Sequence, residues 1–276
     1  MKFLLTLIIC CMLCGCSLQN DFSESTTIPV MSSELFLTDV YTEASIETTM
    51  ATETTVPDVS ISVPAGSHKR SYTDSETNDY LDYYLFVPEN AEINMPLIVF
   101  LHGDGEVGDV ELLEDFGIIR SARQIYGNEF PFIVVSPSTR IYSWIKGNIP
   151  ATLKGLIDEV ASECQVDPER IILTGHSRGS IGTWHMVSTY GNYFSAAVPV
   201  SADSEGMLNY DNLTSIPIWT IAGSYDTYYL DNMSSLVYMI RQAGGDIQFT
   251  ILEDCHHGET STRAYTQEVF EWMCAQ

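Results

Sequence analysis

Residues 171–182 contain Ser177 between an apolar run and a helical pattern, a position typical of a catalytic serine. Gly175, Ser177 and Gly179 form a Gly-x-Ser-x-Gly pattern, with an apolar run before it and a helical pattern after it. A sharp turn from strand to helix needs small residues beside the nucleophile, because the backbone there is strained and crowded. The pentapeptide alone occurs by chance. Its position between a strand and a helix favours Ser177 as a nucleophile over a tight turn with an incidental serine.

An orienting acid is expected after this serine and before a histidine, which is the chain order for a serine on such a turn. Asp226 follows the apolar run Ile216–Gly223 and its turn, and we predict that it is this acid. Asp203 and Asp231 are the rivals, since a carboxylate in a turn is more often a cap or a solvated side chain.

Two adjacent histidines, His256 and His257, follow the last apolar run, Ile247–Leu252. Either could serve as the general base. We favour His257, which precedes Gly258, and keep His256 as its alternative and as a candidate substrate contact. A histidine pair can also bind a metal ion, but no partner ligands stand nearby at metal-site spacing. We therefore predict neither a metal nor another cofactor.

The segment from His102 to Gly105 leaves an early apolar run as His-Gly-x-Gly. Glycines there expose backbone N–H groups, and we predict that the N–H groups of Asp104 and Arg178 form the oxyanion hole. The alternative is that the glycines simply make a turn. Three further side chains near the expected site are candidate substrate contacts: His102, His176 and Trp144. Trp144 would stack on a sugar or an aromatic acyl group, unless it completes the edge of the core.

Short apolar runs alternate with helical patterns from residue 80 onwards. Continuous apolar runs are typical of strands covered on both faces, and the alternation predicts βαβ units with a mostly parallel sheet flanked by helices. The predicted strands are Tyr80–Val87, Pro96–His102, Pro131–Ser136, Arg170–Gly175, Ala196–Ser201, Ile216–Gly223 and Ile247–Leu252. The predicted helices are Val110–Tyr126, Ala151–Cys164, Gly179–Tyr190, Asp231–Ala243 and Arg263–Cys274.

Residues 80–276 resemble the α/β-hydrolase esterases that include feruloyl and other carbohydrate esterases, polyhydroxybutyrate-depolymerase-like proteins and dienelactone-hydrolase relatives. The matching stretches are Phe100–Glu106, Val166–Ile171, Gly175–Gly179 and Gly244–Thr250. The resemblance implies an α/β-hydrolase fold and a serine ester hydrolase with Ser177, Asp226 and His257 as its triad. The segment between Ser201 and Ile216 is short, so we expect no large lid domain and an open cleft suited to esters on a glycan.

The amino-terminal part of the chain has a different composition. Residues 1–15 read as a secretory leader whose apolar run is too short to span a bilayer. The sequence Leu13-Cys14-Gly15-Cys16 resembles a bacterial lipoprotein box, which implies lipidation of Cys16; an ordinary signal peptide cut nearby is the alternative. Residues 16–66 are rich in serine, threonine and acidic residues and predict a flexible tether. The predicted catalytic domain is 67–276.

The net charge of the 276-residue chain is −25. An acidic excess of this size argues against nucleic-acid binding and against docking on anionic lipids through basic residues. The leader predicts an extracytoplasmic protein, either anchored at the cell surface or secreted, and the charge predicts that it meets the membrane only through its lipid anchor. Two other function classes stay open: a serine peptidase of the prolyl-oligopeptidase type, and a non-catalytic binding lipoprotein that kept the fold.

Overall fold

The computed structural model describes residues 61–276. The predicted leader, Cys16 and most of the predicted tether lie outside the described residues. The described residues before the predicted domain boundary at residue 67 already contact the domain. Ile61 and Val63 pack against the core, and the Ser62 hydroxyl donates to the backbone carbonyl of Glu163 at 2.9 Å.

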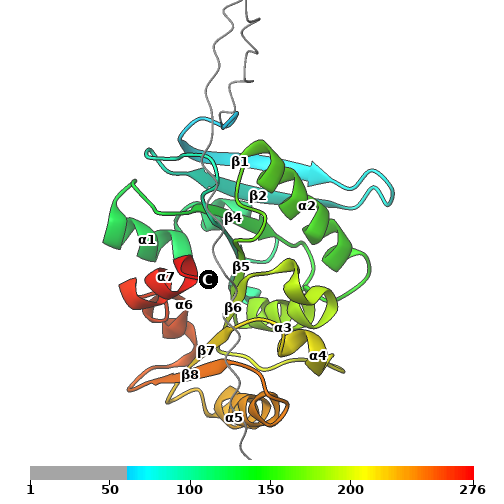
Figure 1. Cartoon of the computed structure of the whole chain (residues 1–276), viewed down its shortest axis with the longest axis vertical. Helices are drawn as coiled ribbons and strands as arrows, with labels where there is room; N and C mark the ends of the chain where they lie inside the picture. Colours follow the sequence, from blue (N-terminus) through cyan, green and yellow to red (C-terminus); the bar gives the residue numbers. More distant parts are fainter. Residues whose placement is uncertain (1–60) are drawn as a thin grey trace, which may run out of the picture. The chain divides into compact units, whose positions relative to one another are not determined.

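A single eight-stranded sheet forms the centre of the domain, in the order β1-β2-β4-β3-β5-β6-β7-β8 (Figure 1). The strands are β1 (Gly66–Thr73), β2 (Tyr80–Val87), β3 (Leu97–Leu101), β4 (Ile133–Ser138), β5 (Ile171–His176), β6 (Ala196–Val200), β7 (Ile218–Gly223) and β8 (Ile247–Leu252). β1 and β2 pair antiparallel with each other, and β2 pairs antiparallel with β4. The six strands from β4 to β8 run parallel, so their carboxyl ends meet at one edge of the sheet.

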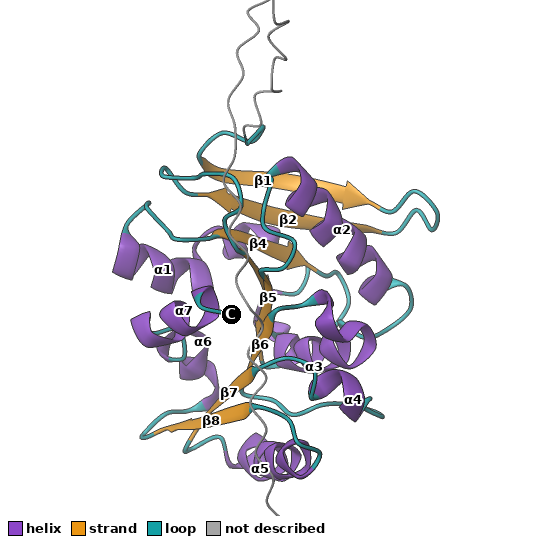
Figure 2. Cartoon of the chain, in the orientation of Figure 1, coloured by secondary structure: helices purple, strands orange, loops and turns teal. Residues whose placement is uncertain are grey.

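Helices cover both faces of the sheet (Figure 2). The helices are α1 (Ile118–Tyr126), α2 (Ile149–Glu163), α3 (Arg178–Tyr190), α4 (Tyr210–Leu213), α5 (Thr227–Gln242), α6 (Thr260–Arg263) and α7 (Gln267–Cys274). Buried residues of α2, α3 and α5 share one apolar cluster, whereas those of α1 and α7 belong to another. The layered mostly parallel sheet confirms the predicted fold class.

All seven predicted strands are present, with ends that differ by at most two residues. The sequence did not reveal β1, because this edge strand is half-exposed and carries Ser-His-Lys-Arg-Ser rather than an apolar run. The prediction of one helix over 110–126 is wrong. A 3-10 helix, Val110–Asp115, precedes α1, and the two are separated at Gly117, which has φ 53° and faces the ring of Phe100.

The segment between β6 and β7 holds only the short helix α4. No lid domain enters there, as the sequence predicts. Within residues 61–276 none of the helices has the length and apolar character needed to cross a membrane.

Two glycines allow α3 to lie directly against the sheet. A Cβ atom at Gly179 would stand 1.9 Å from the backbone oxygen of Leu101 at the end of β3. A Cβ atom at Gly175 would stand 2.4 Å from the backbone oxygen of Gly179. Contacts under 3.0 Å force the backbone to shift, so the turn between β5 and α3 depends on the absence of both side chains.

We expect Gly179→Ala to destabilise the domain by about 3 kcal/mol, the upper range of overpacking effects, because backbone atoms on both sides must move. For a domain of this size that corresponds to a fall in Tm of roughly 10 °C, measurable by calorimetry. Gly105→Ala is the matched control, since a Cβ atom there meets nothing within 4 Å. Equal Tm values for the two variants would contradict this account of the turn.

Candidate active site

Ser177 lies at the sharp turn between β5 and α3. Its backbone has φ 55° and ψ −116°, which is rare for a residue with a side chain. The N–H of Ser177 donates to the carbonyl of Val200 at 2.8 Å, and its own carbonyl accepts from Ser180 at 2.9 Å. These bonds anchor the turn to β6 and to the helix, while the Ser177 side chain remains partly exposed.

The structure brings Ser177, His257 and Asp226 into one hydrogen-bonded chain. Nε2 of His257 lies 2.8 Å from Oγ of Ser177, and Nδ1 of His257 lies 2.6 Å from Oδ2 of Asp226. The tautomer that satisfies both contacts carries its proton on Nδ1 and accepts the serine proton at Nε2. This arrangement can remove the proton from a serine hydroxyl as it attacks a carbonyl.

Each member of this chain follows the carboxyl end of a parallel strand. Ser177 follows β5, Asp226 follows β7 and begins α5 as its N-cap residue, and His257 follows β8. The Asp226 side chain is 6% exposed, whereas the His257 side chain is 37% exposed. The acid is therefore shielded from water, while the imidazole stays accessible to a bound molecule.

The competing residues lie elsewhere. His257 contacts Ser177. The backbone N–H of His256 donates to Glu259, and its ring packs on Tyr225 at 4.8 Å. Burial raises the pKa of Asp203, which does not contact His257. The geometry therefore selects His257 over its neighbour and Asp226 over Asp203.

The loop after β3 lies beside the serine. A Cβ atom at Gly103 would stand 3.4 Å from Cβ of Ser177. Asp104 begins a 3-10 helix, Asp104–Glu106, and Arg178 begins α3, so neither backbone N–H has a partner within its own helix. Their side chains also meet, because the Arg178 guanidinium donates to both carboxylate oxygens of Asp104 at 2.9 and 3.1 Å. This bidentate pair links the two segments expected to supply oxyanion donors.

His102 and Trp144 hold this loop from the protein interior. Nδ1 of His102 lies 2.6 Å from the Gly103 carbonyl, and Nε2 accepts from the backbone N–H of Thr139 at 3.1 Å. The indole N–H of Trp144 donates to the His102 carbonyl at 3.0 Å. Because His102 is fully buried and Trp144 is 1% exposed, the prediction that they contact substrate is wrong. They support the loop, and Trp144 completes the core instead of stacking on a ligand.

His176 is also buried and does not face the cleft. Its Nε2 atom lies 2.9 Å from the carbonyl of His257 and 3.1 Å from Oγ1 of Thr260. The hydroxyl of Thr260 donates to the same carbonyl of His257 at 2.6 Å and accepts from Ser201. The prediction of a substrate contact is therefore wrong for His176, which fixes the backbone of His257 from behind.

Three tyrosines next to Asp226 also surround the site, and the sequence analysis missed them. Tyr225 precedes the acid, while Tyr228 and Tyr229 lie in the first turn of α5. The Tyr229 ring stacks on the imidazole of His257 with centroids 5.2 Å apart. The sequence Tyr-Asp-Thr-Tyr-Tyr around the predicted acid was the available signal.

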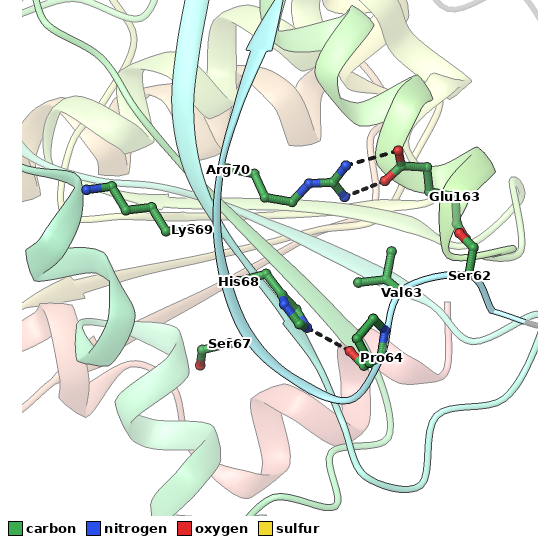
Figure 3. A pocket seen from close by; sticks show the side chains of 8 residues that line it. All are labelled: Ser62, Val63, Pro64, Ser67, His68, Lys69, Arg70 and Glu163. Atoms are coloured by element: carbon green, nitrogen blue, oxygen red, sulfur yellow. Dashed lines mark hydrogen bonds and ion pairs between the residues drawn. The ribbon is translucent and has the colours of Figure 1, made fainter.

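A cavity of about 570 Å³ lies beside the edge strand β1 (Figure 3). Arg70 of β1 pairs with Glu163 at the end of α2, and Nε2 of His68 lies 2.7 Å from the Pro64 carbonyl. β1 is separated from β5 by three strands in the sheet order. This cavity is distinct from the serine site and contains no comparable nucleophile and base.

The part of the chain that the structure describes contains no group of three or more His, Cys, Asp or Glu side chains placed to hold a metal ion. Its three cysteines, Cys164, Cys255 and Cys274, are unpaired thiols.

No family model matches the sequence. Two curated proteins are similar to parts of it. A poly(3-hydroxyalkanoate) depolymerase C from Paucimonas lemoignei is 27% identical over 135 residues, which are 44% of this chain and 31% of that protein. A bifunctional acetylxylan esterase/xylanase from Neocallimastix patriciarum is 27% identical over 124 residues, which are 44% of this chain and 18% of that protein. The match thus spans less than a third of either relative.

Solved structures of esterases share the fold. A thermostable esterase superposes with a TM-score of 0.68 and 26% identity, covering 76% of this chain and 63% of that one. A mutant feruloyl esterase module from Clostridium thermocellum, complexed with sinapinate, superposes with a TM-score of 0.60 and 17% identity, covering 78% and 91%. The eight-stranded sheet and its flanking helices are those of the α/β-hydrolase esterases.

The two buried histidines predict how stability depends on pH. Burial lowers the pKa of His102 and of His176 to about 4, whereas both titrate near 6.5 in the unfolded chain. The unfolded state therefore binds more protons between these values. The stability that the neutral histidines contribute is fully present above pH 6.5 and is lost as the pH falls towards 4.

We expect His176→Gln to flatten this dependence, because the amide keeps a donor for the His257 carbonyl but takes up no proton. The free energy of unfolding, measured by urea titration between pH 6.5 and 4, should fall less steeply in the variant, by up to about 1.4 kcal/mol per pH unit. Parallel curves for wild type and variant would show that His176 is not held neutral by the fold.

Proposed function

We propose that this chain, which has the fold of the α/β-hydrolase esterases, is a serine carboxylic-ester hydrolase. The observation that carries the proposal is the continuous chain of contacts from Ser177 Oγ through the His257 imidazole to the Asp226 carboxylate. The esterases among the relatives and the structural neighbours support the same reaction class.

In the proposed mechanism, Nε2 of His257 takes the hydroxyl proton of Ser177 as Oγ attacks the ester carbonyl. Asp226 holds the imidazole with its proton on Nδ1 and stabilises the imidazolium. The backbone N–H groups of Arg178 and Asp104 receive the oxyanion. His257 then returns the proton to the leaving alcohol, and water hydrolyses the acyl-enzyme with the same base.

We propose carbohydrate-linked esters, of the acetyl or feruloyl type, as the substrates. The similarity to an acetylxylan esterase supports this choice, and so does the absence of a lid domain in the described segment between β6 and β7. A partly exposed Ser177 suits an ester presented on a large glycan better than a lipid chain that must be buried. The net charge of −25 disfavours polyanionic substrates through long-range repulsion.

We expect Ser177→Ala to lower kcat for p-nitrophenyl acetate about 10⁴-fold or more, because the acyl-enzyme cannot form. Ser234→Ala, an exposed serine on α5, is the matched control and should retain full activity. Mass spectrometry after reaction with a fluorophosphonate should find the adduct on Ser177 in the wild type and none in the Ser177→Ala chain.

His257→Ala should lose activity to a similar extent. Activity that survives in His257→Ala but disappears in His256→Ala would assign the base to the other histidine. Equal turnover by wild type and Ser177→Ala would overturn the proposed nucleophile. Absence of both labelling and turnover in the wild type would favour a binding role.

We also propose that Cys16 carries a lipid that anchors the protein on the outer side of the membrane. The support is the leader-like composition of residues 1–15 and the sequence Leu13-Cys14-Gly15-Cys16. In a bacterial host fed with labelled palmitate, the full chain should become labelled and sediment with membranes. Cys16→Ser should abolish the labelling and the sedimentation with membranes, whereas Cys14→Ser should leave both unchanged. A labelled Cys16→Ser protein would contradict the proposal.

A further inference from the structure

An aromatic surface extends from the His257 imidazole to solvent. Tyr229 stacks on that imidazole with an interplanar angle of 23°, and Tyr228 meets Tyr229 edge-on with centroids 4.9 Å apart. Tyr225 packs against His256 at 4.8 Å. Tyr225 and Tyr228 are 53% and 75% exposed, so their rings are available to stack on a bound molecule. We name Tyr225, Tyr228, Tyr229 and His256 the tyrosine shelf.

The position of the shelf determines which half of the ester it meets. In the proposed reaction the acyl oxygen points to the backbone N–H groups of Arg178 and Asp104, while Nε2 of His257 protonates the leaving alcohol. The alcohol half must therefore lie beside the imidazole. Tyr229 stacks on this ring and Tyr228 packs edge-on against Tyr229, so the shelf lies next to the group that protonates the alcohol half.

The surroundings of the shelf select the chemistry of that alcohol. The Tyr225 hydroxyl donates to Asp254, and Glu205 and Asp104 flank Arg178 on the neighbouring surface. Carboxylates accept hydrogen bonds and, when ionised, cannot donate them. An aliphatic polyester carries mainly acceptors, which can accept from the tyrosine hydroxyls but offer no donor to these carboxylates. A sugar offers hydroxyl donors to the carboxylates and an apolar C–H face to the tyrosine rings.

We propose that the tyrosine shelf is a subsite for a neutral sugar ring on the alcohol side of the scissile ester bond. The inference rests on the proposed ester hydrolase function and specifies its leaving group: an uncharged glycan that presents the ester on one of its hydroxyls. An acidic glycan is disfavoured there, because the carboxylate of Asp254 lies beside the shelf and the whole chain has a net charge of −25.

The test compares esters that share an acyl group and differ in the alcohol. We would measure kcat/KM of the full chain for acetylated xylotriose against ethyl acetate, and for a feruloylated arabinoxylo-oligosaccharide against methyl ferulate. Tyr228→Ala should lower the ratio of sugar ester to simple ester about 3- to 10-fold, chiefly through KM, because it removes a stacking face. Tyr228→Phe keeps the ring and should keep the ratio within about twofold of wild type.

Tyr238→Ala is the matched control. Tyr238 is a 63% exposed tyrosine of the same helix, and it lies about 15 Å further along the helix axis than Tyr228. Its substitution should leave the ratio unchanged. A ratio that is equal in wild type, Tyr225→Ala and Tyr228→Ala would overturn the subsite.

Two further measurements separate the inference from the proposed function. Binding of free xylotriose, followed by calorimetry, should weaken in Tyr228→Ala and not in Tyr238→Ala; this readout needs no hydrolysis and would keep the subsite testable if every ester failed. A methyl ester of a 3-hydroxybutyrate dimer serves as the aliphatic substrate that is compared with the sugar esters. A preference for this ester that Tyr228→Ala abolishes would assign the shelf to polyesters and overturn the sugar proposal.

Discussion

The backbone of Ser177, with φ 55° and ψ −116°, is the constraint on which the rest of the site depends. A residue with a side chain holds such a conformation only when its surroundings enforce it. Here the enforcement comes from bonds to β6 and α3 and from two glycines that let α3 approach β3. The same close approach brings the loop after β3 beside Ser177, so the proposed nucleophile and the proposed oxyanion donors are positioned by one packing contact.

Two buried histidines, His102 and His176, hold the loops around Ser177 through hydrogen bonds to the backbone. His102 links the Gly103 carbonyl to the Thr139 N–H. His176, which precedes Ser177 at the turn between β5 and α3, contacts the backbone carbonyl of His257. Both must be neutral to make these bonds without placing a charge in the interior. The histidines of the two motifs, His-Gly-x-Gly and Gly-His-Ser, therefore act on the geometry of the loops rather than on a bound molecule.

The sequence was sufficient for the elements and the order of the site residues, because strands and helices here differ clearly in period and the functional residues follow strand ends. It failed where burial depends on tertiary contacts. His102 ends one predicted strand and Trp144 follows another, and nothing in their spacing shows that each side chain is buried. The edge strand β1 lacks an apolar run, because only one side of it packs. Tyr228 is visible in the sequence two residues after the predicted acid, but its position near His257 depends on where α5 begins.

The start of α5 joins catalysis to recognition. Asp226 is its N-cap residue, and Tyr228 and Tyr229 occupy its first turn, where the helix dipole also favours the negative charge of the acid. A displacement of this helix end would move the carboxylate away from His257 and tilt the tyrosine rings at the same time. Asp226, Tyr228 and Tyr229 therefore share one helix end, and under the proposed function a glycan bound on these rings would also restrict the imidazole that stacks on Tyr229. Sugar binding on the alcohol side should then favour the His257 tautomer that carries its proton on Nδ1 and faces Ser177 through Nε2. The same contact would select the leaving alcohol and support the proton transfer that releases it.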